Sequence, residues 1–325
     1  MVHASGILLR EPTDASSDLE TTSIRAPLPF EILIPMSSRE LRLIVLTGSD
    51  RLEVQKALRN LLPFIRDSDG ISLAGTFSRD QVIPPDVTAE LVLVLGGDGS
   101  ILRGCRQLGM RQIPIIGVNL GRLGFLTDLS PEDFLEGLSQ LRSGNYEIVE
   151  HLMLECEFHQ SDGPVHRDLG LNEVTVTSGG SLKMLDIRME IDGVEVTTFS
   201  CDGLIISTPV GSTAHNLSAG GPILRQDLQV VAITPICPHT LTVRPIVESA
   251  DRTFTLAVSD PPPGVCVVID GQIRRAVEAG DRIIVRRAEP TFKLVRLPGH
   301  NYYNTLHRKL GWHGQLDYQE RRPPQ

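Results

Sequence analysis

A glycine-rich segment at residues 96–100 has the composition of a phosphate-binding loop. Gly96-Gly97-Asp98-Gly99-Ser100 follows the apolar run LVLVL and precedes the helical pattern ILRGCRQL. Glycines let backbone N–H groups approach a ligand without a Cβ in the way, and a following helix N-terminus adds a positive dipole end. A carboxylate beside a bound phosphate is repelled by it, so the presence of an acid in this loop needs an explanation. Asp98 could hold a divalent metal, accept a proton from an attacking hydroxyl, or merely cap the helix.

Two familiar nucleotide-binding motifs are excluded. The pattern G-x-x-x-x-G-K-[ST] does not occur in the chain. The dinucleotide fingerprint G-x-G-x-x-G fails because Leu102 stands in the third glycine position. The chain also has only four lysines, so backbone N–H groups and arginines are the more available phosphate ligands.

Two further segments have residue types that suit a nucleotide. Residues 201–223, CDGLIISTPVGSTAHNLSAGGPI, combine a short apolar strand with many small and hydroxyl residues, which expose backbone donors and leave room for a flat ligand. Asn172 and Glu173 open a predicted strand although both are poor strand formers. Such a pair can bind a ribose diol. The alternatives are a Gly/Ser surface loop and an exposed strand entrance.

The elements that must position these residues change in character near residue 150. Before it, apolar strands at 41–46, 91–95 and 113–118 alternate with helical patterns at 51–65, 101–108 and 130–143, which predicts a parallel sheet covered on both faces. After it, many short strands rich in Val, Ile and Thr predict an antiparallel β sandwich. We therefore expect a Rossmann-like α/β N-terminal domain plus an all-β, sandwich-like C-terminal domain.

The predicted boundaries are a disordered extension at 1–38, the α/β domain at 39–148, the β domain at 149–298, and a segment at 299–325 that returns to the α/β domain. The extension is polar and without periodicity.

Composition excludes several classes of protein. The formal net charge of −9 and the lack of a basic patch argue against nucleic-acid binding. No apolar run approaches 18 residues, so we expect no membrane span. The five cysteines are far apart, and no histidine pair has metal-ligand spacing, so we expect reduced thiols, no protein metal cluster, and a cytoplasmic protein.

Taken together, these segments resemble the NAD kinase family over residues 91–312. The resemblance includes GGDGS, NLGRLGFL (119–126), LNEV (171–174), DGLIISTPVGSTAHNLSAGGPI (202–223), TPICPHTLTVRP (234–245), DGQ (270–272) and NTLHRKLGW (304–312). GGDG alone is shared with lipid kinases and phosphofructokinases, whereas the TPxGSTAxxxSAGGP segment is specific to NAD kinases.

The resemblance implies roles for individual residues. Asp98 matches the family's acceptor of the 2′-hydroxyl proton. The residues that would bind the dinucleotide or the phosphates are Gly96, Gly97, Gly99, Ser100, Arg103, Phe125, Asn172, Glu173, Lys183, Asp202, Thr213, Ala214, His215, Asn216, Leu217, Ser218 and Gln272. One departure stands out, because the family usually has Tyr where this chain has His215. Imidazole is smaller, so stacking on a base would weaken without vanishing.

The resemblance further implies ATP-dependent phosphorylation of the 2′-hydroxyl of NAD to give NADP. ATP would be the phosphoryl donor, NAD the substrate and Mg²⁺ the divalent ion. The family's usual assembly implies a homo-oligomer, a dimer or a tetramer with sites near subunit contacts.

Two other functions remain open on the sequence alone. A lipid kinase of the diacylglycerol or sphingosine type would share GGDG but needs an apolar cleft, and aromatic residues make up only 4% of this chain. A non-catalytic dinucleotide sensor finds its only support in His215. The intact Asp98, Asn172 and Glu173 speak against the sensor.

Overall fold

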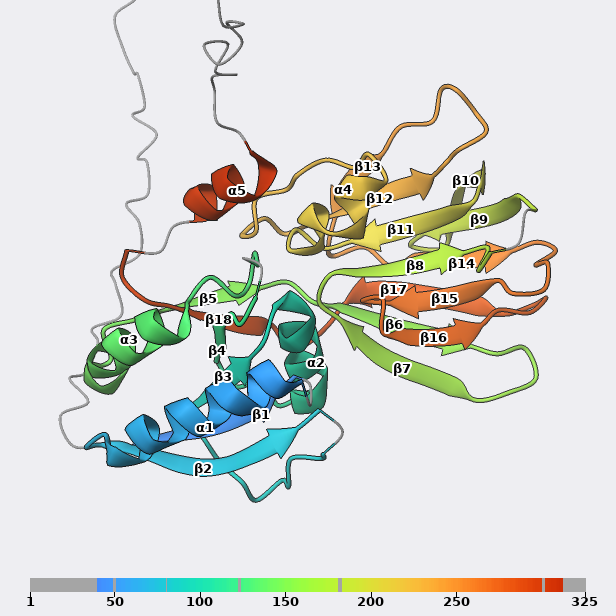
Figure 1. The fold of residues 1–325 in the computed structure, drawn as a ribbon. Coiled ribbons are helices and arrows are strands. Elements are labelled where there is room, and N and C mark those ends of the chain that lie inside the picture. Colours follow the sequence, from blue (N-terminus) through green and yellow to red (C-terminus); the bar gives the residue numbers. More distant parts are fainter. Residues whose placement is uncertain are drawn as a thin grey trace, which may run out of the picture. The chain divides into compact units, whose positions relative to one another are not determined.

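The structure is a computed structural model that describes residues 40–48, 51–79, 81–121, 124–180, 183–299 and 302–311. The predicted extension at residues 1–38 lies outside these ranges. Figure 1 shows an α/β part and a part built from two antiparallel sheets. All five cysteines are described and free, and four of them are buried. Among the described helices, none has the length and hydropathy needed to cross a membrane.

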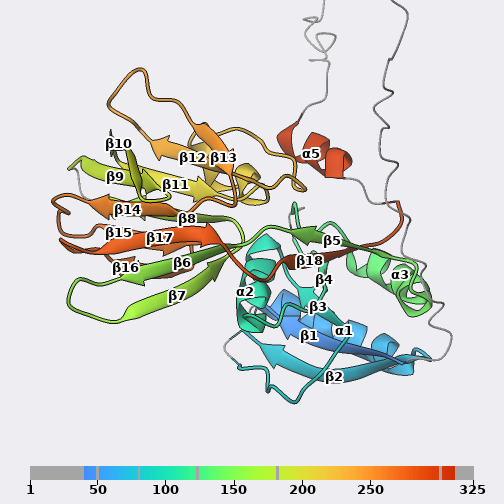
Figure 2. The same ribbon diagram turned by 180° about the vertical axis from the view of Figure 1, so that it is seen from behind.

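The first sheet has the strand order β2-β1-β3-β4-β18-β5. Its central pairs are parallel, and only β18 with β5 is antiparallel. Strand β18 comes from the far end of the chain and lies between β4 and β5 (Figure 2). The strands are β1 (Leu41–Thr47), β2 (Ile71–Ser78), β3 (Leu91–Leu95), β4 (Ile115–Val118), β5 (Glu147–His151) and β18 (Phe292–Arg296).

Helices cover both faces of this sheet, as the continuous apolar strands predict. The odd-numbered residues of β3 pack with α1 (Leu52–Asp67) and α3 (Pro131–Ser143), and its even-numbered residues pack with α2 (Asp98–Leu108). Side chains alternate across a strand, so a fully apolar β3 feeds two cores. Helix α3 begins where the sequence predicts it, because Ser130 and Asp133 form a capping box.

The other two sheets form the predicted sandwich. Their strand orders are β10-β9-β14-β17-β6-β7 and β13-β12-β11-β8-β15-β16, and one hydrophobic core contains residues of both. The first contains β6 (Leu154–His159), β7 (Val165–Gly170), β9 (Leu185–Ile191), β10 (Val194–Cys201), β14 (Phe254–Val258) and β17 (Arg282–Arg287). The second contains β8 (Glu173–Thr177), β11 (Gly203–Ser207), β12 (Val230–Ile236), β13 (Ile246–Ser249), β15 (Cys266–Ile269) and β16 (Ile273–Ala276).

The short η1 (Gly211–Thr213) and α4 (His215–Ser218) follow β11, and α5 (Tyr302–Leu310) ends the described chain. The predicted fold class is confirmed. The sequence pattern predicts strand β18 in the β domain, but β18 joins the first sheet, where it pairs parallel with β4 and antiparallel with β5. The domain boundaries themselves stay a prediction.

Candidate active site

Asp98 is the first residue of α2, and its carboxylate holds the loop that follows β4. Oδ2 accepts the backbone N–H of Phe125 at 2.7 Å, and Oδ1 accepts those of Leu126 and Thr127 at 3.0 and 3.1 Å. The hydroxyl of Thr127 donates to Oδ1 as well, at 3.1 Å. A Cβ at Gly124 would overlap Oδ1, so this loop needs a glycine there. Oδ2, with one bond, keeps the free acceptor capacity of this carboxylate.

The glycine loop lines a cavity of about 770 Å³. Three arginines and one carboxylate, Glu53, contribute to its walls, so its lining carries an excess of positive charge. Helix α2 adds N–H groups of its first turn, which have no intrahelical acceptor. Six predicted residues line this cavity together: Gly96, Gly97, Gly99, Ser100, Arg103 and Gln272. The arrangement fits a polyphosphate.

The glycines of the loop have different structural roles. Gly96 has a φ of +143°, and a Cβ there would overlap the Ser100 side chain. A Cβ on Gly97 or Gly99 would meet no atom within 4 Å. Gly96 is therefore needed by the fold, while Gly97 and Gly99 leave open space on the cavity side.

Two side chains connect the loop to neighbouring elements. Arg103 donates to the carbonyl oxygen of Gly48, which follows β1. Gln272, from the turn between β15 and β16, donates from Nε2 to the carbonyl oxygen of Gly99 at 3.1 Å. The second bond joins the β sandwich directly to the glycine loop.

Asn172 and Glu173 stand at the start of β8 in a largely buried setting. Glu173 is only 6% exposed, and its Oε2 has no hydrogen-bond partner among the described residues. Burial, reinforced by the nearby charge of Asp270, raises the pKa of Glu173 to about 8. The expected alternative, an exposed strand entrance, does not apply to Glu173. Its carboxyl group is protonated near neutral pH and can donate or accept a hydrogen bond.

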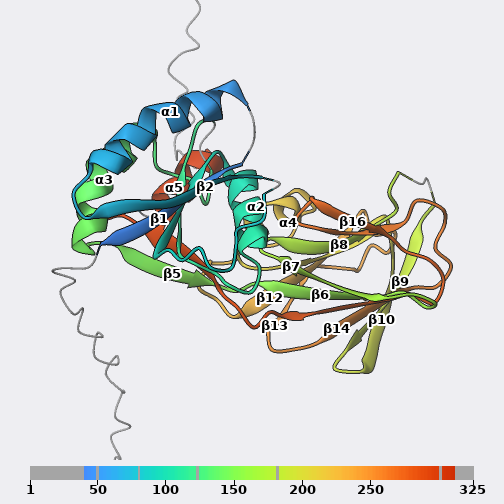
Figure 3. The ribbon, with the colours of Figure 1, turned by 90° about the horizontal axis from the view of Figure 1, so that it is seen from below.

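The glycine loop's helix and the other two segments share one core. Ile101 and Leu102 of α2 belong to the same cluster as Leu171, next to the Asn-Glu pair, and Val210, in the loop after β11. Helix α2 lies beside the sandwich strands in Figures 1 and 3. The packing thus brings the three sequence motifs to one region.

The loop after β11 is held by its own hydroxyl and amide groups. Thr208 donates to the carbonyl oxygen of Leu171 at 2.6 Å, which joins the loop to the Asn-Glu segment. The carboxamide of Asn216 is fully buried, donates to the carbonyl oxygens of Ser212 and Pro222, and accepts from Thr234 at 2.6 Å. In this structure, the side chain of Asn216 uses its hydrogen-bonding groups to hold the loop.

His215 is exposed at the start of α4. Its position leaves the ring accessible to a ligand. The other predicted residues of this loop are partly or fully exposed: Thr213, Ala214, Leu217 and Ser218. Phe125 is half-buried, and the ammonium of Lys309 in α5 lies 5.1 Å from its ring centroid.

Lys183 and Asp202 are not brought together with the rest. Both are exposed, and Asp202 precedes Gly203, which pairs with Thr177 at the end of β8 opposite Glu173. A five-residue strand spans roughly 17 Å, so Asp202 lies about that far from the Asn-Glu pair. Within one chain, these two residues and Glu173 do not form one contact surface.

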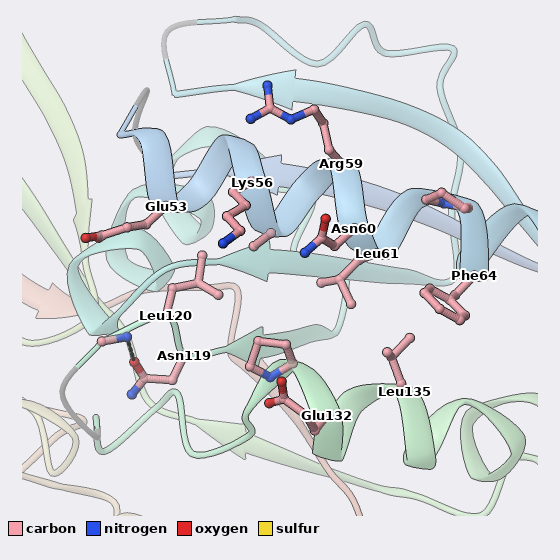
Figure 4. A pocket seen from close by; sticks show the side chains of 14 residues that line it. Glu53, Lys56, Arg59, Asn60, Leu61, Phe64, Asn119, Leu120, Glu132 and Leu135 are labelled. Atoms are coloured by element: carbon pink, nitrogen blue, oxygen red, sulfur yellow. Dashed lines mark hydrogen bonds between the residues drawn. The ribbon is translucent and has the colours of Figure 1, made fainter.

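A second cavity, of about 800 Å³, adjoins the first between α1 and α3 (Figure 4). The two cavities share Glu53 and residues 119–121, where Asn119 Oδ1 accepts the N–H of Gly121 at 2.8 Å. Leu61, Leu120 and Leu135 give the second cavity apolar walls in Figure 4. A ligand in the first cavity has room to extend into the second.

Some residues of the site were not predicted from the sequence. Arg51 and Arg79 line the cavity of the glycine loop, but single arginines outside any recognisable pattern give no motif. Asp270 binds the Asn-Glu segment through its carboxylate. Its signal was the Asp-Gly pair directly after a strand, which is typical of a tight hairpin turn.

Comparison with known proteins gives a consistent result. A family model described as the ATP-NAD kinase N-terminal domain matches residues 52–146, and one described as the ATP-NAD kinase C-terminal domain matches residues 171–297. An NAD kinase from Rhodopirellula baltica is 47% identical over 276 residues, which cover 85% of this chain and 88% of that protein. An NAD kinase from Geotalea daltonii is 41% identical over 78% of this chain and 89% of its own length.

Solved structures resemble the chain as well. An NAD kinase from Archaeoglobus fulgidus in complex with ATP aligns with a TM-score of 0.65 and 30% identity, over 83% of this chain and 99% of that one. The yeast NADH kinase complexed with NADH aligns with a TM-score of 0.79 over 87% of this chain and 91% of its own. At 20% identity, the yeast enzyme supports the fold alone.

Proposed function

The chain belongs to the NAD kinase family, and we propose that it transfers the γ-phosphate of ATP to the 2′-hydroxyl of the NAD adenosine ribose to give NADP. The observation that carries the proposal is the cationic cavity lined by the glycine loop, which is bonded through Gln272 to the sandwich that presents Asn172 and Glu173. A donor phosphate site and a ribose site thereby meet at one place.

Each part of the site has a task in an in-line transfer. The loop N–H groups and the arginines bind the donor phosphates and balance their charge. Asn172 and Glu173 fix the ribose, so that only one hydroxyl can attack. Asp98 accepts the proton of that hydroxyl through Oδ2, the carboxylate oxygen with free capacity. The loop after β11, with His215, contacts the bases.

The residues present fit a divalent ion, Mg²⁺, carried by the triphosphate. The described residues contain no group of three or more His, Cys, Asp or Glu arranged to hold a metal. Mg²⁺ is commonly bound by substrate phosphates with few protein ligands, so the ion needs no carboxylate cluster here and leaves Asp98 Oδ2 free to accept the proton. When bound, the ion neutralises charge on the transferring phosphate.

A homo-oligomer, a dimer or a tetramer, is part of the proposal. The strands β10 and β13 end their sheets and expose apolar side chains, among them Val194, Val196 and Val247. Exposed apolar edge strands favour association with another chain. An oligomer also explains how Lys183 and Asp202 can take part in binding, because these side chains can reach the dinucleotide of a neighbouring subunit. The free cysteines support a reducing, cytoplasmic location.

The test is a coupled assay for NADP with the purified full chain, ATP, Mg²⁺ and NAD. We expect turnover with NAD and none with diacylglycerol under the same conditions. Phosphorylation of diacylglycerol without NADP formation would support a lipid kinase. NAD binding without turnover in either arm would support the sensor. A parallel arm with inorganic polyphosphate identifies the donor.

A further inference from the structure

The turn between β15 and β16 contacts both halves of the site within three residues. Gln272 donates its N–H to the carbonyl oxygen of Ile269 at 2.9 Å, and the central residues Asp270 and Gly271 have φ values of +50° and +64°. Two successive left-handed residues make a type I′ turn, which is tight and has few alternative conformations. The turn therefore presents Asp270 and Gln272 in a fixed relation.

Asp270 is bonded to the backbone of the Asn-Glu segment. Its Oδ1 accepts the N–H groups of Asn172 and Glu173 at 2.7 and 3.1 Å, and Oδ2 accepts that of Leu171 at 2.8 Å. In return, Asp270 donates its own N–H to the carbonyl oxygen of Glu173 at 3.0 Å. Asp270 is 8% exposed, so these bonds are largely shielded from water. One carboxylate thus fixes three consecutive residues.

Gln272 contacts the other half of the site, the phosphate-binding glycine loop. Its Nε2 binds the carbonyl oxygen of Gly99, inside the glycine loop. Its Oε1 is buried and has no partner among the described residues. The side chain of Gln272 also lines the cavity of the glycine loop, so this residue contacts the donor site as well as Gly99.

We propose that Asp270 is a positioning residue, and that the turn Asp270–Gln272 sets the distance between the ribose-binding segment and the phosphate-binding loop. The inference rests on the proposed function and adds a residue to it. Asp270 touches neither substrate. It acts through the backbone of Asn172 and Glu173, while Gln272 keeps Gly99 in register with them.

Asp270 also influences the charge of Glu173. Burial is the main cause of the raised pKa of Glu173, and the charge of Asp270 raises it further. Burial raises the pKa of Asp270, whereas its three backbone hydrogen bonds and the charge of Arg106 on α2 act in the opposite direction and favour its ionised form. The buried thiol of Cys105, also on α2, lies in the field of the Asp270 charge. Removing the charge of Asp270 should therefore move the pKa of Glu173 down. A purely structural role would leave that pKa unaffected.

The decisive variant is Asp270→Asn, which keeps the size but loses the charge and one acceptor. We expect KM for NAD to rise about 10- to 100-fold, because the charged acceptor that orders the ribose-binding segment is lost. KM for ATP should stay within about twofold. The pH profile of kcat/KM for NAD should shift to lower pH. An unchanged KM for NAD, or an unshifted profile, would overturn the proposal.

Asp192→Asn is the matched control. Asp192 also precedes a glycine, has a φ of +51° and accepts a backbone N–H, that of Thr253, at 2.9 Å, but it lies in the exposed turn between β9 and β10. We expect wild-type kinetics. If both variants change KM equally, the effect belongs to turns of this kind in general and the positioning role is refuted.

A second variant keeps the test valid if Asp270→Asn does not fold, as judged by circular dichroism. Gln272→Ala removes the bond to Gly99 and should lower kcat about tenfold while NAD binding, measured by calorimetry, stays unchanged. Unchanged kcat would overturn the proposal. The proposed function fails separately, because a wild-type chain that makes no NADP refutes the kinase itself and not the turn.

Discussion

The carboxylate of Asp98 is bonded twice to Thr127, through the backbone N–H and through the side-chain hydroxyl, each at 3.1 Å to Oδ1. Oδ1 is therefore committed to the loop after β4, and Oδ2 is the oxygen left for chemistry. The same side chain thus orders the loop and, in the proposed mechanism, accepts the proton.

The variant Asp98→Asn separates these two tasks from substrate binding. An amide cannot take the hydroxyl proton, so we expect kcat to fall about 10²- to 10⁴-fold, the usual contribution of a general base. NAD affinity, measured by calorimetry, should stay within about threefold. Full activity would refute the proton-acceptor role.

Thr127→Val is the matched control for that experiment. It removes one donor to Oδ1 and keeps the carboxylate, so kcat should fall by less than about tenfold. A loss as large as that of Asp98→Asn would show that the carboxylate acts through the loop alone.

Two glycine substitutions distinguish the needs of the fold from those of the ligand. Gly97→Ala adds a methyl group that meets no protein atom within 4 Å, so the melting temperature should stay within about 2 °C while KM for ATP rises about tenfold or more. Gly96→Ala introduces strain at a φ of +143° and an overlap with Ser100, so it should destabilise by about 1–3 kcal/mol. Unchanged KM in Gly97→Ala would place the phosphates elsewhere.

Glu173 should make stability depend on pH. Its pKa of about 8 in the fold lies above the unfolded value near 4.5, so the folded state retains a proton that the unfolded state has lost. The free energy of unfolding should therefore fall as pH rises between these values, by roughly 1.4 kcal/mol per pH unit from this group.

Urea unfolding of wild type and Glu173→Gln at pH 6 and pH 8 measures this dependence. The difference in unfolding free energy between the two proteins should shift in favour of the variant at pH 8. Glu289→Gln, which changes an exposed carboxylate, serves as the control. Parallel pH profiles for all three proteins would contradict the raised pKa.

Local sequence signals predicted local structure well. Ser130-Pro131 and Gly144 marked the ends of α3, and the all-apolar run Leu91–Leu95 marked a strand buried on both faces. Pairing between distant strands was not predictable. Nothing in the residues of β18 distinguishes a last sandwich strand from a strand of the first sheet, since partner choice depends on the assembled fold.

The candidate site could likewise be predicted from the sequence only as far as local patterns reach. The motif at 201–223 was found, but the sequence does not show which small polar side chains face inward. Asn216 uses its whole carboxamide on Ser212, Pro222 and Thr234, whereas its neighbour His215 is exposed. Asp270 was visible only as part of DGQ, because its role depends on a turn that meets a segment about a hundred residues earlier.

His215→Tyr restores the residue usual in the family and should tighten NAD binding. A larger exposed ring offers more stacking area, and aromatic pairs gain about 0.5–1.5 kcal/mol, which corresponds to roughly 2- to 10-fold in Kd. His215→Ala should weaken binding by a similar factor. Calorimetry with NAD checks both variants, and equal affinities for all three proteins would exclude stacking at this position.

Asp202 supplies a test of the proposed assembly. It is exposed and lies roughly a strand length of 17 Å from the Asn-Glu pair of its own chain. If it contacts the dinucleotide of a neighbouring subunit, Asp202→Lys should raise KM for NAD about tenfold or more. Glu289→Lys, an exposed change outside the edge strands β10 and β13, is the control for added positive charge. An unaffected KM in Asp202→Lys would remove Asp202 from the site.

Mixing the two impaired variants, assayed at an NAD concentration below the wild-type KM, then decides which chain contributes Asp202. In a dimer of one Asp98→Asn chain and one Asp202→Lys chain, a site built across the interface contains either both changes or neither. Random mixing makes half of the dimers hybrid, so about a quarter of all sites should be native and activity should return to that level. If Asp98 and Asp202 served the same site within one chain, every site would carry one change. Activity would then stay at the mean of the two variants, which would refute a site shared between subunits.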